Sequence, residues 1–298
     1  MMIKIGMCPN SWGVWFEQND KQIDWHRYLD EIASIGYKYT EIGPYSYMST
    51  DANELKDELD KRGLIPVSGM LMIDIEDDAL METAIEKTVR TCTLLKNIGA
   101  EYYVLMDDMY TDLITGEKRL PKTLTDDQFK KFCANYLKLA NIAKDLGIKS
   151  VFHPHSGTHI ETEEQIDRML DTMSDDDLRI CFDTGHHINV KGNDLYSYTE
   201  KIGDRIDLLH FKDLNEKVKL EVWEKDIPFA TATKMNMFSE FGKGQIDWPR
   251  YAKVLKKINF EGYAMIEHDC YPVDYSVPKP RHTQTGKYFE GVGIGSLR

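Results

Sequence analysis

Short apolar segments alternate with longer amphipathic segments along the whole chain. Segments of the first kind have the length of buried strands; they are Ile3–Cys8, Lys38–Ile42, Leu64–Met70, Tyr102–Met106, Ile148–His153, Leu178–Phe182, Ile206–Phe211 and Tyr263–Ile266. The second kind place apolar residues three and four positions apart, as in a helix with one buried face. They are Trp25–Ile35, Glu54–Lys61, Asp78–Ile98, Asp126–Leu146, Glu163–Met173 and Trp248–Ile258.

Strands that alternate with helices predict a parallel α/β fold. Eight strands favour a closed (β/α)8 barrel, the TIM-barrel architecture, over an open doubly wound sheet. Neither a GxGxxG after the first strand nor a GxxxxGK[ST] sequence is present, so a nucleotide-binding open sheet has little support. Such barrels often reach about 250 residues as one unit, and no linker-like tract divides the chain. We therefore expect a single domain over residues 1–298.

Two segments are less regular. Asn215–Ile246 has no clear periodicity and lies between strands seven and eight. A long loop in a compact domain is usually a functional loop or lid, so we expect this segment to be one of the two. Pro278–Arg298 is expected to supply the eighth helix and a tail.

Composition restricts the partners and the compartment. The chain has 50 acidic and 37 basic residues, a formal net charge of −13. Binding to nucleic acid or to an anionic membrane needs a clustered basic surface, which this sequence lacks. No apolar run approaches a membrane span or a signal peptide. Five scattered cysteines without a CxxC pair indicate reduced thiols. We expect a cytoplasmic protein that binds neither nucleic acid nor membrane.

The ends of the predicted strands are rich in residues of metal-ligand type, and in a barrel the active site lies at the C-terminal strand ends. Glu41 ends strand two, Asp107 and Asp108 end strand four, and Asp183 ends strand six. Glu267 follows strand eight. Of the nine histidines, six lie at the ends of strands five to eight: His153, His155, His186, His187, His210 and His268.

A shared cation explains these strand ends most simply. Asp183, His210 and Glu267 each end an apolar strand, where an unpaired buried charge would cost several kcal/mol. Imidazole together with carboxylate suits Mn, Fe, Co or Zn better than a cage of oxygen ligands alone would. A single histidine or aspartate at a strand end is more often a hydrogen-bonded cap, so the prediction depends on the whole set.

Two further sites are candidates for substrate contact. The aromatic segment Trp12–Phe16 follows strand one and could line a sugar pocket or fill the barrel end as a hydrophobic plug. Lys212 lies two residues after His210, so both side chains point the same way. It could hold a substrate oxygen or stabilise an enolate; the alternative is a salt bridge to Asp213 or Glu267.

The strand-end motifs resemble a known family. They are Asn10-Ser11-Trp12-Gly13, Glu41-Ile42-Gly43-Pro44-Tyr45, His153-Pro154-His155-Ser156-Gly157-Thr158, Asp183-Thr184-Gly185-His186, His210-Phe211-Lys212-Asp213 and Glu267-His268-Asp269. With these motifs the chain resembles the xylose-isomerase-like superfamily of sugar isomerases and epimerases, and in particular its inosose (2-keto-myo-inositol) dehydratases.

The resemblance implies a ligand set. The superfamily commonly binds a divalent metal through a glutamate on strand five, an aspartate on strand six, a histidine on strand seven and a glutamate on strand eight. Asp183, His210 and Glu267 match the last three, while His153 stands where the first glutamate is usual. We therefore expect a site of His153, Asp183, His210 and Glu267 for a divalent metal, Mn first, with Co, Mg, Fe or Zn as alternatives.

The resemblance also implies a reaction. We expect a metal-dependent lyase, a dehydratase of inositol catabolism that acts on a polyhydroxy ketone through a metal-stabilised enediolate. Glu267 and Glu41 are the candidate bases, and His155, His186 and Lys212 the candidates for the acid or for oxyanion stabilisation. Trp12, with His155, His186 and Lys212, is expected to contact the sugar or cyclitol substrate. Barrels of this family often pair, so a homo-oligomer is also compatible with the resemblance.

Other functions remain in competition. An isomerase or epimerase would use the same metal and base but would return the proton to the substrate; the absent glutamate on strand five favours the dehydratase. An endonuclease for abasic DNA, which the superfamily includes, conflicts with the net charge of −13. A non-catalytic sugar-binding protein would leave the buried ligand set unexplained.

Overall fold

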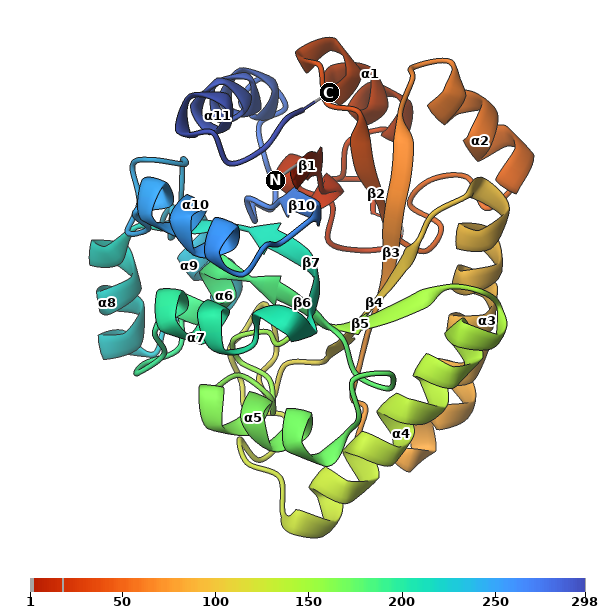
Figure 1. The fold of residues 1–298 in the computed structure, drawn as a ribbon, viewed down its shortest axis with the longest axis vertical. Helices are drawn as coiled ribbons and strands as arrows, with labels where there is room; N and C mark the ends of the chain where they lie inside the picture. Colours follow the sequence, from red (N-terminus) through yellow and green to blue (C-terminus); the bar gives the residue numbers. More distant parts are fainter. Residues whose placement is uncertain (1–2, 18, 298) are drawn as a thin grey trace.

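The computed structural model describes residues 3–17 and 19–297, and its centre is a closed barrel of parallel strands (Figure 1). The strands follow one another around the barrel in the order β1-β10-β7-β6-β5-β4-β3-β2. Their bounds are β1 Ile3–Met7, β2 Tyr39–Pro44, β3 Ile65–Ile73, β4 Tyr102–Asp107, β5 Lys149–Phe152, β6 Ile180–Asp183, β7 Ile206–Phe211 and β10 Gly262–Ile266. All eight predicted strands are present, and the predicted TIM barrel is confirmed.

Helices surround the barrel (Figure 1). They are α1 Trp25–Ile35, α2 Ala52–Asp60, α3 Met81–Ile98, α4 Asp126–Asp145, α5 Glu163–Thr172, α7 Leu195–Lys201, α10 Trp248–Lys257 and α11 Pro278–Val292. The six predicted helices are all found, with small differences at their ends, and α11 supplies the expected eighth helix. Within the described ranges, none of these helices combines the length and apolar character needed to cross a bilayer.

The segment Asn215–Ile246 differs from its prediction. It is not irregular, because it forms α8 (Glu216–Lys225) and α9 (Phe229–Lys234). The strands β8 (Asp213–Leu214) and β9 (Phe238–Ser239) pair antiparallel around these two helices. Asn215 begins α8 by accepting a hydrogen bond from the backbone N–H of Val218, a cap that satisfies one free donor of the first turn.

Two layers of apolar side chains form the core. Along β4, Tyr103 and Leu105 point outward and pack with the helices, while Tyr102, Val104 and Met106 point into the barrel. This alternation is the expected one for a closed parallel barrel. The interior cluster is completed by Cys8, Tyr39, Val67, Val151, Cys181, Leu208 and Met265. Apolar side chains thus fill the barrel below the carboxyl ends of its strands.

Candidate active site

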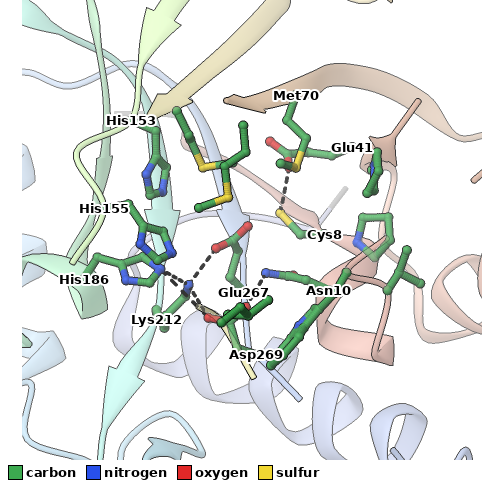
Figure 2. A pocket seen from close by; sticks show the side chains of 18 of the residues that line it. Cys8, Asn10, Glu41, Met70, His153, His155, His186, Lys212, Glu267 and Asp269 are labelled. Carbon is green, nitrogen blue, oxygen red and sulfur yellow. Dashed lines mark hydrogen bonds and ion pairs between the residues drawn. The ribbon is translucent and has the colours of Figure 1, made fainter. Parts of the chain in front are cut away.

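A pocket opens at the carboxyl ends of the barrel strands (Figure 2). Six of the residues predicted from the sequence line it: Glu41, His153, His155, His186, Lys212 and Glu267. Asp183 and His210 lie beside these residues but deeper, with 1% and 3% of their surfaces exposed. The predicted site residues therefore lie together, with the exception of Trp12. Two of the strand-end histidines do not line the pocket: His187 contacts Glu163, and His268 packs near His282.

The four predicted metal ligands converge. His153, Asp183, His210 and Glu267 each offer one donor atom, and these atoms all lie within 4.8 Å of one another. His153 Nε2 is 3.6 Å from Asp183 Oδ2, and His210 Nδ1 is 3.3 Å from Glu267 Oε1. Among the described residues, His153 Nδ1, Asp183 Oδ2 and His210 Nδ1 are buried without a hydrogen-bond partner. Because such orphaned atoms are costly, this donor set fits a divalent cation.

Lys212 is a buried ammonium beside these ligands. Its Nζ lies 2.6 Å from Asp269 Oδ2, 2.9 Å from Glu267 Oε2 and 3.4 Å from Asp183 Oδ2. Burial alone would lower its pKa, but these carboxylates outweigh burial and raise the pKa well above its usual value. The side chain passes over Gly185, where an added Cβ would lie 2.6 Å from the lysine Cβ and Cγ. A larger residue in place of this glycine would displace the lysine.

The hydrogen bonds of His155 and His186 indicate which nitrogen of each ring carries a hydrogen. Lys212 can only donate, so His186 Nε2 accepts a hydrogen bond from it over 2.7 Å, and His186 Nδ1 carries the hydrogen that faces Ser156 Oγ at 3.0 Å. His155 Nδ1 donates to the backbone oxygen of Ser156 over 2.8 Å. Burial lowers the pKa of His155 to about 3, with help from the charges of His153 and Lys212. Both imidazoles are therefore neutral.

Glu41 lies at the opposite wall, on β2, and accepts three hydrogen bonds. Ser68 Oγ and His210 Nε2 donate to Oε1 over 2.6 and 3.0 Å, and the thiol of Cys8 donates to Oε2 over 3.1 Å. Burial raises the pKa of Cys8 well above its usual value, and the charges of Glu41 and Glu267 raise it further. Cys8 therefore remains a thiol.

The structure contradicts the predicted role of Trp12. Its side chain is fully buried, with 0% exposed, and its Nε1 donates to Glu31 Oε2 over 2.8 Å. The short 3-10 turn Pro9–Trp12 directs the ring between α1 and α11, where it packs against Tyr28 and His282. Trp12 is thus a core residue. The neighbouring Trp15 lines the pocket instead.

Three further pocket residues, Asn10, Asp269 and Phe229, were not among the predicted site residues. Asn10 Nδ2 donates to Asp269 Oδ1 over 2.9 Å, and Asp269 in turn accepts from Lys212. Asp269 follows Glu267 by two residues, as Lys212 follows His210, so the same alternation could have identified it. Phe229 of α9 adds an aromatic wall near His155 and His186. Its position follows from the fold of Asn215–Ile246, which the sequence did not reveal.

Comparisons with known proteins agree with this architecture. A family model described as "Xylose isomerase-like TIM barrel" matches residues 29–289. The inosose dehydratase of Geobacillus kaustophilus is 28% identical over 280 residues, covering 90% of this chain and 88% of the relative. The inosose dehydratase of Clostridium perfringens is 27% identical over 292 residues, covering 92% and 94%.

Solved structures share the fold at low sequence identity. An L-ribulose 3-epimerase has a TM-score of 0.73 at 17% identity, covering 98% of this chain and 95% of the epimerase. The probable 3-DHS dehydratase involved in petrobactin synthesis from Bacillus anthracis has a TM-score of 0.71 at 15% identity, covering 94% and 97%. These neighbours include both epimerases and a dehydratase, so the fold alone does not select the reaction.

Proposed function

The chain belongs to the xylose isomerase-like TIM barrel family, and from that premise we propose that it is a metal-dependent dehydratase of a polyhydroxy ketone such as 2-keto-myo-inositol. The observation that carries this proposal is the convergence of four buried donor groups beside the ammonium of Lys212. The relatives named inosose dehydratase, aligned over about nine-tenths of the chain, support the choice of substrate. Such an activity would belong to inositol catabolism.

The cation would be held by His153, Asp183, His210 and Glu267. Two imidazoles with two carboxylates suit Mn²⁺ well, and Co²⁺, Fe²⁺ and Zn²⁺ are alternatives; Mg²⁺ prefers oxygen ligands alone. When bound, the cation supplies Lewis-acid polarisation of the ketone and an adjacent hydroxyl, which lowers the pKa of the α-proton.

We assign the removal of the α-proton to Glu267. Burial alone would raise its pKa, but His210 and Lys212 hold the pKa well below its usual range. Its carboxylate is therefore ionised and lines the pocket. As the C–H bond breaks, the proton goes to Glu267 and the electron pair forms the new carbon–carbon double bond.

We assign the proton for the departing β-hydroxyl to Lys212. The N–H groups of His155 and His186 are directed at Ser156. By contrast, the N–H of Lys212 that faces Glu267 is released toward the substrate when that carboxylate takes up the α-proton. The C–O bond breaks, and the hydroxide leaves as water with a proton from Lys212. Glu267 Oε2 lies 2.9 Å from Lys212 Nζ, so direct proton transfer between them restores both groups. His155 Nε2, an acceptor in a neutral ring, would bind a substrate hydroxyl.

The test is proton NMR of the protein with 2-keto-myo-inositol and Mn²⁺ in deuterated water. Formation of the dehydrated diketone is expected. The Asp183→Ala variant, which lacks one proposed ligand, serves as the control and should form none. Complete absence of reaction with the wild-type protein would remove this substrate from consideration.

An epimerase is the second candidate. Two carboxylates, Glu41 and Glu267, both line the pocket, and two bases on different walls could exchange protons with opposite faces of a sugar. His153, directly after β5, stands at the usual glutamate position, which argues for the dehydratase. In the same NMR experiment, deuterium in the recovered sugar or a new epimer without loss of water would establish the epimerase.

A further inference from the structure

We infer, on the basis of the metal site proposed above, that Glu41 is a positioning residue. It fixes the tautomer and ring orientation of His210 and does not accept the substrate proton. Glu41 lies on β2 and His210 on β7, and both side chains project into the barrel (Figure 2 shows Glu41). The hydrogen bond between them spans the top of the barrel.

The two nitrogens of His210 face two different carboxylates. Nε2 lies 3.0 Å from Glu41 Oε1, and Nδ1 lies 3.3 Å from Glu267 Oε1. A carboxylate accepts hydrogen bonds and has no hydrogen to donate, so Nε2 carries its hydrogen toward Glu41. Nδ1 is then the nitrogen left for a cation, and it would give up its own proton when the cation binds. It has no hydrogen-bond partner among the described residues and lies 3.3 Å from Glu267 Oε1.

Glu41 is itself held in place. Ser68 of β3 donates to Oε1 over 2.6 Å, and Cys8, directly after β1, donates to Oε2 over 3.1 Å. Ser68 and Cys8 are buried, with 0% and 1% exposed, and Glu41 is 5% exposed. With the bond from His210, three donors engage the carboxylate. A carboxylate bound by three donors, one of them a histidine of the proposed ligand set, is suited to orienting that histidine.

The hydrogen bond from His210 to Glu41 is of a kind that is common in metal sites. A metal-binding histidine nearly always donates its second ring N–H to a carboxylate, a carbonyl or water, and loss of that partner costs about 10–100-fold in metal affinity. Without Glu41, the neutral imidazole of His210 could carry its hydrogen on either nitrogen. The ring would also be free to turn away from the other three ligands.

The experiment titrates Co²⁺ alone, without substrate, into the metal-free protein and follows the visible absorption of the bound ion. Glu41→Ala should weaken Co²⁺ binding by about 10–100-fold and change the absorption spectrum. Glu41→Gln keeps an oxygen acceptor for His210 Nε2 but removes the charge. It should restore most of the affinity and the wild-type spectrum.

Asp107→Asn is the matched control. Asp107 also ends a barrel strand and accepts from a histidine, His159 Nδ1, over 2.8 Å, but it belongs to a separate group of donors, with Glu76 and His159, outside the proposed ligand set. Its substitution should leave the affinity for Co²⁺ unchanged. Thermal unfolding of each metal-free variant separates a general loss of stability from a specific loss of affinity. Ser68→Ala, a milder change that removes one support of Glu41, should weaken Co²⁺ binding less than Glu41→Ala does.

Three outcomes would overturn this assignment in different ways. Wild-type Co²⁺ affinity in both Glu41 variants, with turnover lost, would identify Glu41 as the proton acceptor. Equal loss of affinity in Glu41→Ala and Glu41→Gln would mean that the negative charge of Glu41, and not its hydrogen bond to His210, supports metal binding. If Asp183→Ala also binds Co²⁺ as the wild type does, the metal site itself is wrong, which is the failure of the proposed function and not of the role of Glu41 alone.

Discussion

Lys212 provides the clearest prediction for a single residue. Replacing it by Met leaves the buried carboxylates of Asp183, Glu267 and Asp269 without the ammonium that neutralises them. Removing one partner of a buried ion pair typically costs about 3–5 kcal/mol. The metal-free Lys212→Met variant should lose stability by about this amount. Turnover should fall by roughly 10²–10³-fold, as when a donor to a developing charge is removed. Co²⁺ binding should be retained or tightened, because a competing positive charge is gone.

Urea unfolding, turnover and Co²⁺ titration of this variant check the three statements. A variant that unfolds like the wild type, or that loses Co²⁺ together with turnover, would contradict the role of Lys212 as a separate donor.

The two tryptophans after β1 should respond differently to substitution. Trp12 is buried against Tyr28 and His282, so Trp12→Ala should reduce the free energy of unfolding by about 3–5 kcal/mol and leave KM nearly unchanged. Trp15 stacks on Tyr271 and lines the pocket. Trp15→Ala should raise KM by roughly tenfold, the equivalent of one aromatic contact of about 1.4 kcal/mol. Steady-state kinetics and urea unfolding of both variants provide the test, and the reverse pattern would reinstate Trp12 as the pocket residue.

These residues also show how far the site could be predicted from the sequence. Asp183, His210 and Glu267 could be grouped because barrel topology brings the carboxyl ends of all strands to one face. The same logic failed for Trp12, because one 3-10 turn after β1 determines which aromatic ring enters the pocket. The interaction of Glu41 with His210 joins positions 169 residues apart, and no local pattern indicates such a pair.

At the level of elements, His159 ties the loop between β4 and α4 to the barrel. Its Nδ1 donates to Asp107 Oδ2 over 2.8 Å, and its Nε2 donates to the backbone oxygen of Pro121 over 3.0 Å. Both partners only accept, so the ring carries both hydrogens and is charged. Burial opposes this charge, but Asp107, together with Glu76, raises the pKa of His159 above its usual value of 6.5.

The stabilising effect of His159 should therefore depend on pH. A raised folded-state pKa contributes stability that is complete below the unfolded value near 6.5 and is lost as the pH rises through the folded value. The free energy of unfolding in urea should thus fall between pH 6.5 and the folded-state pKa. A His159→Gln variant should show a flatter dependence over this range. Identical pH profiles for the two proteins would argue against the charged bridge.

The elements differ in how well the sequence predicted them. Strands buried on both faces produce continuous apolar runs, so all eight were identified. The α8–α9 segment was missed for physical reasons. α8 is half-exposed, with Leu220 51% exposed, and α9 has only six residues. Neither helix has enough buried positions to produce a clear helical periodicity of apolar residues in the sequence. Their helical form depends on packing against the barrel and on the β8–β9 pair.

For the whole molecule, binding of the metal should be coupled to stability. A ligand that binds only the folded state stabilises it by about 2.7 kcal/mol at 100 times its Kd. For a chain of this size, that corresponds to an increase in Tm of roughly 4 °C. Calorimetry after chelation, and again after Mn²⁺ is restored, should show this difference. The Asp183→Ala variant should show none, and an equal shift in that variant would mean that Mn²⁺ binds elsewhere.

The pairing that closes the barrel has a consequence for biosynthesis. β1 pairs with β10, with Ile3 opposite Gly262, so the first strand leaves the ribosome long before its partner. At about 5–20 residues per second, that interval lasts roughly 15–50 s. Throughout it, one edge of β1 has no neighbouring strand, and an open edge is a template for aggregation. Chaperone capture of the nascent chain should therefore be strongest just before β10 emerges, when nearly all of the barrel exists but cannot yet close.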